Sequence, residues 1–254
     1  MTKLDLSVAL IVKNEEDRLP LTLNAIHNIA SEIILVDSGS TDNTIEIAKS
    51  FGAKIYSHPW EGFAAQKNFL TQLCNCSWIL FLDADEVVTD QLREEIIKIV
   101  EQNKNFGYEI NRKVFYLGKI LNYSWQKNYR LRLVKRNQSP KWIGSRVHEE
   151  LTISRPTKKL QNYLIHYSYR DITDHFSRTV IYAKLSALDY HERKKSSSII
   201  KILLKPAFAF FRNYFFKLGF LDGLPGLIAS ISSSFYSFLK YSILYNLQKN
   251  KNVK

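Results

Sequence analysis

Short apolar runs alternate with amphipathic segments over the first hundred residues. The runs have the length of strands, and their apolar character is typical of strands buried on both faces of a parallel sheet. They are Leu6–Val12, Ile33–Val36 and Trp78–Leu82, and Ala53–Ser57 is a further predicted strand. Between them, helical spacing predicts helices over 18–30, 43–51, 64–73 and 90–102. This alternation predicts an α/β fold with a mostly parallel central sheet flanked by helices.

Residues typical of helix ends support these boundaries. Pro20 is acceptable in the first turn of the first helix. Thr41 or Asp42 is expected to cap the second helix, which Gly52 closes, and Asp90 is expected to cap the fourth.

The pattern changes after Gly107 to short strands rich in aromatic and basic residues. They are expected to extend the sheet with mixed or antiparallel pairing and to build a cleft for an acceptor. The segments are 108–112, 114–117, 129–134, 151–154 and 164–167. From Ile172 to Lys195 the spacing is helical, with Phe176, Val180, Ala183 and Ala187 on one stripe.

The C-terminal segment predicts an amphipathic pair of helices. The first covers 199–220, and the second, after a Gly-rich break at 219–226, covers 227–247. A membrane span needs about 20 predominantly apolar residues, but basic residues interrupt the first helix and serines the second. We therefore expect the pair to lie on an anionic membrane surface. Packing against the rest of the chain and a dimer interface remain alternatives.

Acidic residues follow three of the four predicted parallel strands. They are Glu15-Glu16-Asp17, Asp37 in Asp-Ser-Gly-Ser, and Asp83-Ala-Asp85-Glu86. Open α/β sheets bind ligands at the carboxyl ends of their strands, so these acids are expected to share one rim. Two aspartates there can hold a hard divalent cation that neutralises a diphosphate. The simpler interpretation is a solvated acidic strand end.

Charge divides the chain of 254 residues, whose net charge is +12. Residues 1–100 carry 8 Lys and Arg against 15 Asp and Glu, whereas residues 101–254 carry 28 against 9. The basic part suits a phosphorylated substrate, an anionic membrane or a nucleic acid. Cys74 and Cys76 are too few for a disulfide framework, and no secretory signal is evident at the start, so we expect a reducing, cytosolic environment.

Several enzyme classes lack their signatures in this sequence. There is no Gly-x-Gly-x-x-Gly after the first strand and no Gly-x-x-x-x-Gly-Lys-Ser/Thr motif, which disfavours dinucleotide oxidoreductases and P-loop NTPases. A nucleotidyltransferase would also use a metal ion to bind a diphosphate. Such enzymes usually have a Gly-rich, basic nucleotide-binding loop near the start of the chain, whereas the loop at 13–17 is acidic. No nucleic-acid motif accompanies the positive charge.

Three motifs resemble those of the GT-A domain of glycosyltransferase family 2. They are Val8–Glu16, Val36–Asp42 and Phe81–Glu86, within a match covering about residues 4–155. Arg130–Arg136, Trp142, Val147–Leu151 and Gly219–Gly223 are similar to a narrower group, the lipopolysaccharide core β-glucosyltransferases. The resemblance implies a GT-A domain over 1–170, with a nucleotide-sugar half (1–100) and an acceptor half (101–170). A helical, membrane-associating extension would cover 171–254.

The resemblance also implies roles for the acidic strand ends. Asp37 would accept a hydrogen bond from uracil, with Glu15 as a second nucleotide-site acid and Lys67 as a basic residue near the nucleotide. Asp85 would ligate Mn²⁺ or Mg²⁺, and Asp83 would lie near the ribose or the metal's waters. The alternatives are a turn carboxylate or helix cap for Asp37, a solvated loop charge for Glu15 and an exposed helix lysine for Lys67. Glu86 is expected only to cap the following helix.

Inversion in one displacement requires a base that takes the proton of the acceptor hydroxyl. The resemblance implies Glu149, in the Val-His-Glu motif on the far side of the cleft, as this base; Glu150, which would point the other way on an extended chain, is the weaker alternative. His148 is a candidate for completing the metal shell, and His166 a weaker one. Arg130, Arg132 and Arg146 either grip phosphate or form a solvated basic face.

The sequence therefore predicts a peripheral enzyme at the cytoplasmic face of the inner membrane. It would use a UDP-sugar, glucose being the first candidate, and a lipid-linked anionic oligosaccharide such as one ending in inner-core heptose. Another UDP-sugar or acceptor is the alternative; nucleic acid is not an expected partner, and a homo-oligomer remains open.

Overall fold

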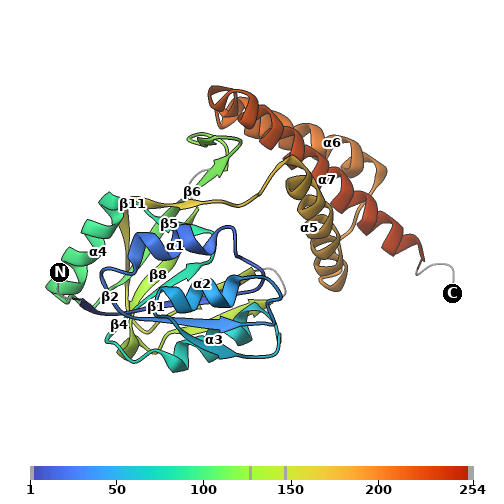
Figure 1. Cartoon of the computed structure of the whole chain (residues 1–254). Coiled ribbons are helices and arrows are strands. Elements are labelled where there is room, and N and C mark those ends of the chain that lie inside the picture. Colours follow the sequence, from blue (N-terminus) through green and yellow to red (C-terminus); the bar gives the residue numbers. More distant parts are fainter. Residues whose placement is uncertain (1–2, 126–127, 146–147, 251–254) are drawn as a thin grey trace. The chain divides into compact units, whose positions relative to one another are not determined.

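The computed structural model describes residues 3–125, 128–145 and 148–250 (Figure 1). The chain divides into two compact units. The first comprises Met1–Lys113 and Lys127–Tyr167, and the second comprises Val114–Gln126 and Ser168–Lys254. Each unit has its own elements and contacts, which are described separately below.

The N-terminal half of the first unit is a parallel sheet in the order β3-β2-β1-β4. Its strands are β1 (Leu4–Val12), β2 (Ala30–Asp37), β3 (Lys54–Ser57) and β4 (Trp78–Asp83). The helices of this half are α1 (Leu19–Ile26), α2 (Thr44–Ser50), α3 (Phe63–Leu73) and α4 (Asp90–Gln102). The predicted α/β alternation is confirmed.

The second half of this sheet is antiparallel, and the prediction of mixed pairing there is confirmed. The order continues from β4 through β8, β6 and β11 to β5. These strands are β8 (Tyr129–Lys135), β6 (Gly107–Tyr116), β11 (Thr157–His166) and β5 (Glu86–Val88). Strands β9 (Lys141–Ser145) and β10 (His148–Thr152) form a separate antiparallel pair, preceded by the short 3₁₀ turn η1 (Arg136–Gln138).

Alternate residues of the central strands enter two apolar cores, one on each face of the sheet. In β1, Leu10 belongs to the core that includes residues of α1 and α4, whereas Ala9 belongs to the core that includes Leu70 of α3. Trp142 of β9 and Leu151 of β10 complete the second core. Burial on both faces explains why these strands are nearly continuous apolar runs.

One predicted helix cap is corrected. Thr89, not Asp90, caps α4, because its hydroxyl accepts a hydrogen bond from the Leu92 amide at 3.3 Å. Asn43 directly precedes α2 and makes no side-chain capping hydrogen bond, whereas the Asp42 carboxylate accepts one from the Thr44 amide at 3.0 Å, as the prediction for Asp42 requires.

The predicted strands 108–112 and 114–117 form one strand, β6, rather than two. Beyond it, Leu117 and Gly118, with φ of 48° and 83°, turn the chain into β7 (Lys119–Ile120) as a two-residue hairpin. Both central residues of such a turn need positive φ, which the glycine adopts without strain.

The second unit is mainly helical. It contains α5 (Ile172–Glu192), α6 (Ile199–Phe211), a π-helical turn η2 (Arg212–Phe216), a 3₁₀ turn η3 (Gly219–Asp222) and α7 (Leu224–Asn250). Val180, expected on the apolar stripe of α5, is exposed, and the buried side of this helix instead includes His175 and Thr179. Among the described residues, no helix is both long enough and apolar enough to cross a membrane.

Asp222 fixes the 114–126 segment to the helices of this unit. Its buried carboxylate accepts hydrogen bonds from the amides of Asn122, Tyr123 and Ser124 at 2.9, 3.1 and 2.7 Å. These bonds bridge about a hundred residues of sequence, so the hairpin and its following loop belong structurally to the helical unit.

Candidate active site

The strand register brings the predicted acidic ends to one rim of the parallel sheet. Val12 of β1 pairs with Asp37 of β2, and Ile11 pairs with Asp83 of β4. Glu15 and Asp85 come shortly after β1 and β4. This is the place where open α/β sheets bind their ligands.

Asp83 lies among three cations. One carboxylate oxygen accepts a hydrogen bond from Lys67 Nζ at 2.9 Å, and the other accepts one from Arg132 at 2.6 Å. Arg112 lies 3.6 Å from the second oxygen. Burial opposes ionisation of Asp83, but Arg132, Lys67 and Arg112 together hold its pKa well below the usual range. Asp83 is therefore a fixed anion.

Glu86 is the second anion of this cluster. It is fully buried and receives hydrogen bonds from Arg112 at 2.8 Å and from Arg132 at 2.6 Å, while its other oxygen accepts from the Asp83 amide at 3.0 Å. The expectation that Glu86 only caps the next helix is wrong. It instead provides the counter-charge that allows two arginines to lie beneath the rim.

Arg18 connects two of the acidic loops. It makes paired hydrogen bonds to Glu15, both 2.8 Å long, and its other terminal nitrogen lies 3.5 Å from Asp85 and 3.1 Å from the Tyr167 carbonyl. Asp85 also lies 3.5 Å from His166 Nε2. Burial acts to raise the pKa of Asp85, but His166 and, more weakly, Arg18 lower it overall.

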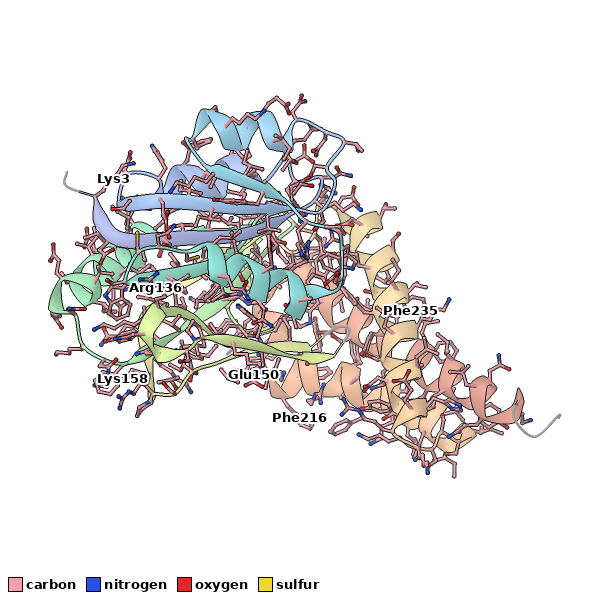
Figure 2. The ribbon with its side chains drawn as sticks, turned by 90° about the horizontal axis from the view of Figure 1, so that it is seen from below. Lys3, Arg136, Glu150, Lys158, Phe216 and Phe235 are labelled. Carbon is pink, nitrogen blue, oxygen red and sulfur yellow. The ribbon has the colours of Figure 1, made fainter. Side chains whose placement is uncertain are left out.

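Lys67 joins the parallel half of the unit to the β9–β10 pair. Its buried ammonium lies 3.1 Å from Glu149 as well as 2.9 Å from Asp83, and it sits over the Trp142 ring at 4.5 Å. The alternative of an exposed helix lysine is therefore wrong. Glu149 is partly buried at this contact, whereas Glu150 on the same strand is exposed (Figure 2).

Asp37 shapes the loop after β2. Its carboxylate accepts hydrogen bonds from the amides of Gly39 and Ser40 and from the Ser40 hydroxyl, at 2.6–3.1 Å. Gln66 of α3 donates to the Ser38 hydroxyl at 2.7 Å. The turn role and a nucleotide role are compatible, because a carboxylate has lone pairs for more than one donor.

The structure thus brings Lys67, Asp83 and Glu149 together, and separately Glu15 and Asp85 through Arg18. The side chain of His148 and the whole of Arg146 lie outside the described residues. Of the predicted phosphate-binding arginines, Arg130 is exposed and Arg132 is buried against Asp83 and Glu86.

Sequence reasoning missed Arg18, Arg112 and the role of Glu86. For Arg18, a signal was present: it follows Glu15 by three positions where helix α1 begins, a spacing at which ion pairs form. Arg112 lies on a strand whose partner acids are 26 or more positions away, so nothing local marked it.

The residues present fit a divalent cation shared with a substrate rather than one caged by protein. Within the described part of the chain, no three His, Cys, Asp or Glu side chains are arranged to hold a metal. Mg²⁺ is usually held by one or two carboxylates together with substrate phosphates and water. Asp85, whose contacts to Arg18 and His166 are both long at 3.5 Å, suits that arrangement.

An α/β sheet whose acidic carboxyl rim is backed by buried cations is the framework of an enzyme that binds a charged ligand at that rim. Comparison with known proteins defines it further. The family model of glycosyl transferase family 2 matches residues 7–177. The chain therefore belongs to this family and is a glycosyltransferase, in agreement with the resemblance of its three motifs.

Similar proteins match nearly the whole chain. An uncharacterised glycosyltransferase of Rickettsia typhi is 30% identical, with 98% of this chain and 89% of that protein covered. The lipopolysaccharide core biosynthesis glycosyltransferase LpsC of Rhizobium meliloti is 28% identical, with 96% and 93% covered. Among solved structures, S. aureus TarS 1–349 has a TM-score of 0.48 at 13% identity, with 99% and 92% covered.

Proposed function

We propose that this glycosyltransferase transfers a hexose, with glucose as the first candidate, from a UDP-sugar to the inner core of lipopolysaccharide, with inversion at the anomeric carbon. One contact carries the proposal: at the carboxyl rim, the Lys67 ammonium lies 3.1 Å from Glu149 and 2.9 Å from Asp83. A carboxylate from the acceptor half thus lies beside the proposed donor site. The similarity to LpsC over 96% of the chain supports the acceptor class.

The donor would lie along the rim. Asp37 would accept a hydrogen bond from the uracil ring and Asp83 one from the ribose, with Lys67 and Glu15 completing the charge pattern around the nucleotide. Asp85 would hold Mn²⁺ or Mg²⁺ against the diphosphate, and His148 is a further proposed ligand. When bound, such a cation neutralises the charge of the leaving diphosphate.

The chain's own residues supply orientation and proton transfer. In the proposed step the acceptor oxygen bonds to the anomeric carbon as the bond from that carbon to the UDP β-phosphate oxygen breaks. Glu149 takes the acceptor hydroxyl proton. Lys67 holds Glu149 by an ion pair and is itself held by Asp83, so the base keeps a fixed position between substrate binding and reaction.

A donor screen tests the reaction class. Purified protein is incubated with UDP-glucose, UDP-galactose and UDP-N-acetylglucosamine, with core oligosaccharide as acceptor, and UDP release is measured with and without EDTA. We expect acceptor-dependent release from one UDP-hexose, loss of release with EDTA and recovery with Mn²⁺ or Mg²⁺. Full activity in EDTA would refute the metal assignment, and no release from any UDP-sugar would refute the donor assignment.

Paired substitutions test the residues. Glu149→Gln is expected to lower kcat by about 10²- to 10⁴-fold, the usual contribution of a general base, with donor affinity retained. Glu150→Gln, which makes the same change at the exposed neighbouring position, is the matched control. Asp85→Asn is expected to weaken metal-dependent UDP binding, whereas Asp90→Asn at the exposed start of α4 should not. Equal effects within either pair would refute that assignment.

The helical unit is the proposed membrane-associating part, corresponding to the predicted extension over 171–254. Its helix α6 exposes Ile200, Leu203 and Leu204 by 68, 66 and 63%, with Lys201 and Lys205 on the same helix. An amphipathic helix with this combination binds the surface of an anionic bilayer. We accordingly propose peripheral attachment at the cytoplasmic face of the inner membrane, where a lipid-linked anionic acceptor would be accessible.

A further inference from the structure

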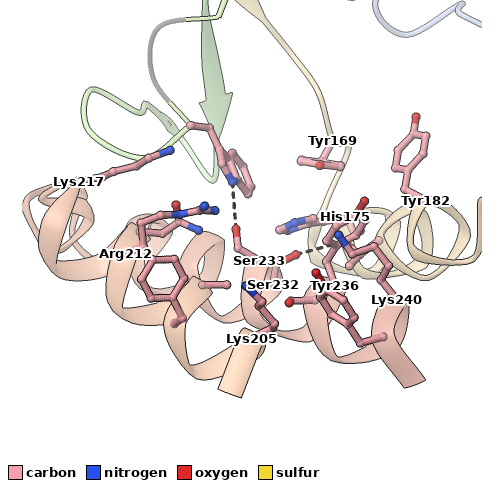
Figure 3. Close-up of a pocket in the computed structure, with 17 residues that line it drawn as sticks. Tyr169, His175, Tyr182, Lys205, Arg212, Lys217, Ser232, Ser233, Tyr236 and Lys240 are labelled. Carbon is pink, nitrogen blue, oxygen red and sulfur yellow. Dashed lines mark hydrogen bonds between the residues drawn. The ribbon is translucent and has the colours of Figure 1, made fainter. Parts of the chain in front are cut away.

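The helical unit contains a cavity of about 500 Å³ (Figure 3). Its walls come from α5, α6, η2 and α7, together with Trp125 and Tyr169, and all of its lining residues belong to the second compact unit. Its volume lies in the range of small-molecule sites. None of the residues proposed to bind the donor or to act as base lines it.

Four cations line this cavity. They are Lys205, Arg212, Lys217 and Lys240. Among the described residues, the lining includes no Asp or Glu, and none of the four cations forms an ion pair with a carboxylate. Burial, and after it the nearby Arg212, lowers the pKa of Lys217, as expected where positive charges are gathered without counter-charge. The cavity therefore favours an anion.

The cations come from α6, from η2 and the residue that follows it, and from α7, and uncharged hydrogen-bonding groups lie between them. Figure 3 shows Arg212 on one side and Lys240 on the other, with Ser232 and Ser233 between. The nearly buried amide of Asn213 also lines the cavity. Arg212 and Asn213 begin the π-helical turn, a departure from α-helical geometry that often occurs at functional sites.

One wall of the cavity leads to exposed apolar surface. Phe208 lines the cavity and is nevertheless 54% exposed. Leu204, Phe211 and Phe215 lie at helical spacing from it and are 63, 53 and 47% exposed. A ligand with a charged head and an apolar chain could thus satisfy both surfaces at once.

We propose that this cavity binds the phosphate ester headgroup of an amphiphilic molecule, whose apolar chain lies along the exposed side of α6. A phosphomonoester carries nearly two negative charges and several acceptor oxygens. It therefore matches several converging cations better than a single carboxylate does. Arg212 supplies paired donors suited to phosphate oxygens, and Lys205 and Lys240 supply point charges. This site is distinct from the donor rim and its occupancy does not depend on glycosyl transfer.

Calorimetric titration of the full chain tests the proposal. The probes are dihexanoyl phosphatidic acid below its micellar concentration, inorganic phosphate, and dihexanoyl phosphatidylcholine. We expect the phosphatidic acid to bind and the phosphatidylcholine to bind at least tenfold more weakly, because its choline offsets the phosphate charge. Tighter binding of phosphatidic acid than of inorganic phosphate would assign a lipid source, and equal binding of these two would overturn the role of the apolar chain.

Variants connect the binding to the cavity. Arg212→Gln and Lys240→Gln are each expected to weaken phosphatidic acid binding about tenfold or more, the loss expected for a charged hydrogen bond. Lys184→Gln, which removes one charge from an exposed position of α5 outside the cavity, is the matched control and should change binding less than twofold. Glu149→Gln should bind normally, which separates this proposal from the catalytic one.

Three further outcomes would overturn the proposal. They are an absence of binding by either phosphate probe, equal binding of phosphatidic acid and phosphatidylcholine, and equal weakening by Lys184→Gln and Arg212→Gln. Circular dichroism and the Tm of each variant establish that it is folded before its binding is compared.

Discussion

Glu86 is a buried carboxylate that forms ion pairs with two arginines of the first unit. It is fully buried, and both Arg112 and Arg132 depend on it for counter-charge. Removing one partner of a buried ion pair typically costs about 3–5 kcal/mol, because the remaining charge is left uncompensated. We expect Glu86→Gln to lower the free energy of unfolding by about that amount.

Urea unfolding of the full chain, followed by tryptophan fluorescence, measures this change. Glu94→Gln, at an exposed position of α4, is the control and should change the free energy of unfolding by less than about 0.5 kcal/mol. A similarly small change for Glu86→Gln would mean that Arg112 and Arg132 find other partners or water.

The residues of the rim also show what the sequence could and could not predict. Asp37, Asp83, Asp85 and Glu149 could be singled out because strand ends and known motifs mark them. The partners of the arginines beneath them could not be predicted, since Arg132 was singled out for phosphate and instead meets Glu86 across 46 positions of sequence. The sequence left Lys67 open between a buried and an exposed role for the same reason: its partners Asp83 and Glu149 come from strands distant in sequence.

At the scale of elements, Asp222 holds the segment 114–126 in the helical unit. Its Oδ1 accepts from the Asn122 amide, and its Oδ2 accepts from the amides of Tyr123 and Ser124. Only the bond from the Ser124 amide is buried, and leaving a buried amide without an acceptor costs about 1–3 kcal/mol. We expect Asp222→Ala to lower the unfolding free energy by about that amount and Asp222→Asn, which keeps one acceptor oxygen, to lower it by less.

Hydrogen exchange read by mass spectrometry locates the effect. Amides 122–124 should exchange faster in both variants, and faster in Asp222→Ala than in Asp222→Asn. Peptides from β1 and β4 in the first unit are the internal control. Unchanged protection at 122–124 in Asp222→Ala would contradict this role.

Helix α5 contributes a pH dependence through His175. Burial lowers the pKa of this imidazole from 6.5 to about 4, although Asp174 acts in the opposite direction, and its Nδ1 lies 2.7 Å from the Tyr116 hydroxyl. Between pH 4 and 6.5 the unfolded state therefore binds more protons than the folded state. The contribution of neutral, buried His175 to the stability of the folded state is therefore complete above about pH 6.5 and is lost as the pH falls toward 4.

Thermal unfolding of the wild type at pH 7 and pH 5 should accordingly show a lower Tm at pH 5. In His175→Phe, which cannot take up the proton, the difference between the two pH values should shrink. His191→Phe, at the last turn of the same helix, is the control and should keep the wild-type difference. A His175→Phe variant with an unchanged difference would show that other groups carry the pH dependence.

Element boundaries, like the site residues, were predictable where neighbouring residues determine them and not where residues distant in sequence do. Strands β1, β2 and β4 and the helices between them were predictable, because burial on both faces leaves short apolar runs separated by polar segments. The hairpin of β7 and the π-helical turn η2 were not predicted. The positive φ of Leu117 in the hairpin, 48°, and the wider π-helical turn of η2 both depend on packing rather than on local preference.

For the whole molecule, the division of charge and the exposed apolar helix predict reversible membrane binding. Residues 101–254 carry the excess of Lys and Arg, 28 against 9 Asp and Glu, and Phe216 is 77% exposed (Figure 2). We expect co-sedimentation with vesicles of phosphatidylcholine and phosphatidylglycerol, and little with phosphatidylcholine alone. Raising the salt from about 0.1 to 1 M shortens the screening length from about 10 to 3 Å and should release most of the protein.

Apolar and electrostatic contributions can be separated by substitution. Phe216→Glu is expected to reduce vesicle binding even at low salt, because it removes exposed apolar area that would be buried in the bilayer and adds a charge that anionic lipid repels. Leu21→Glu makes a comparable change at a 47% exposed position of α1 and should not reduce it. Donor-dependent UDP release with a soluble acceptor should be the same in both variants. If Phe216→Glu and Leu21→Glu bind vesicles equally well, the π-helical turn η2 that contains Phe216 is not part of the membrane-binding surface, and its exposed apolar residues require another partner.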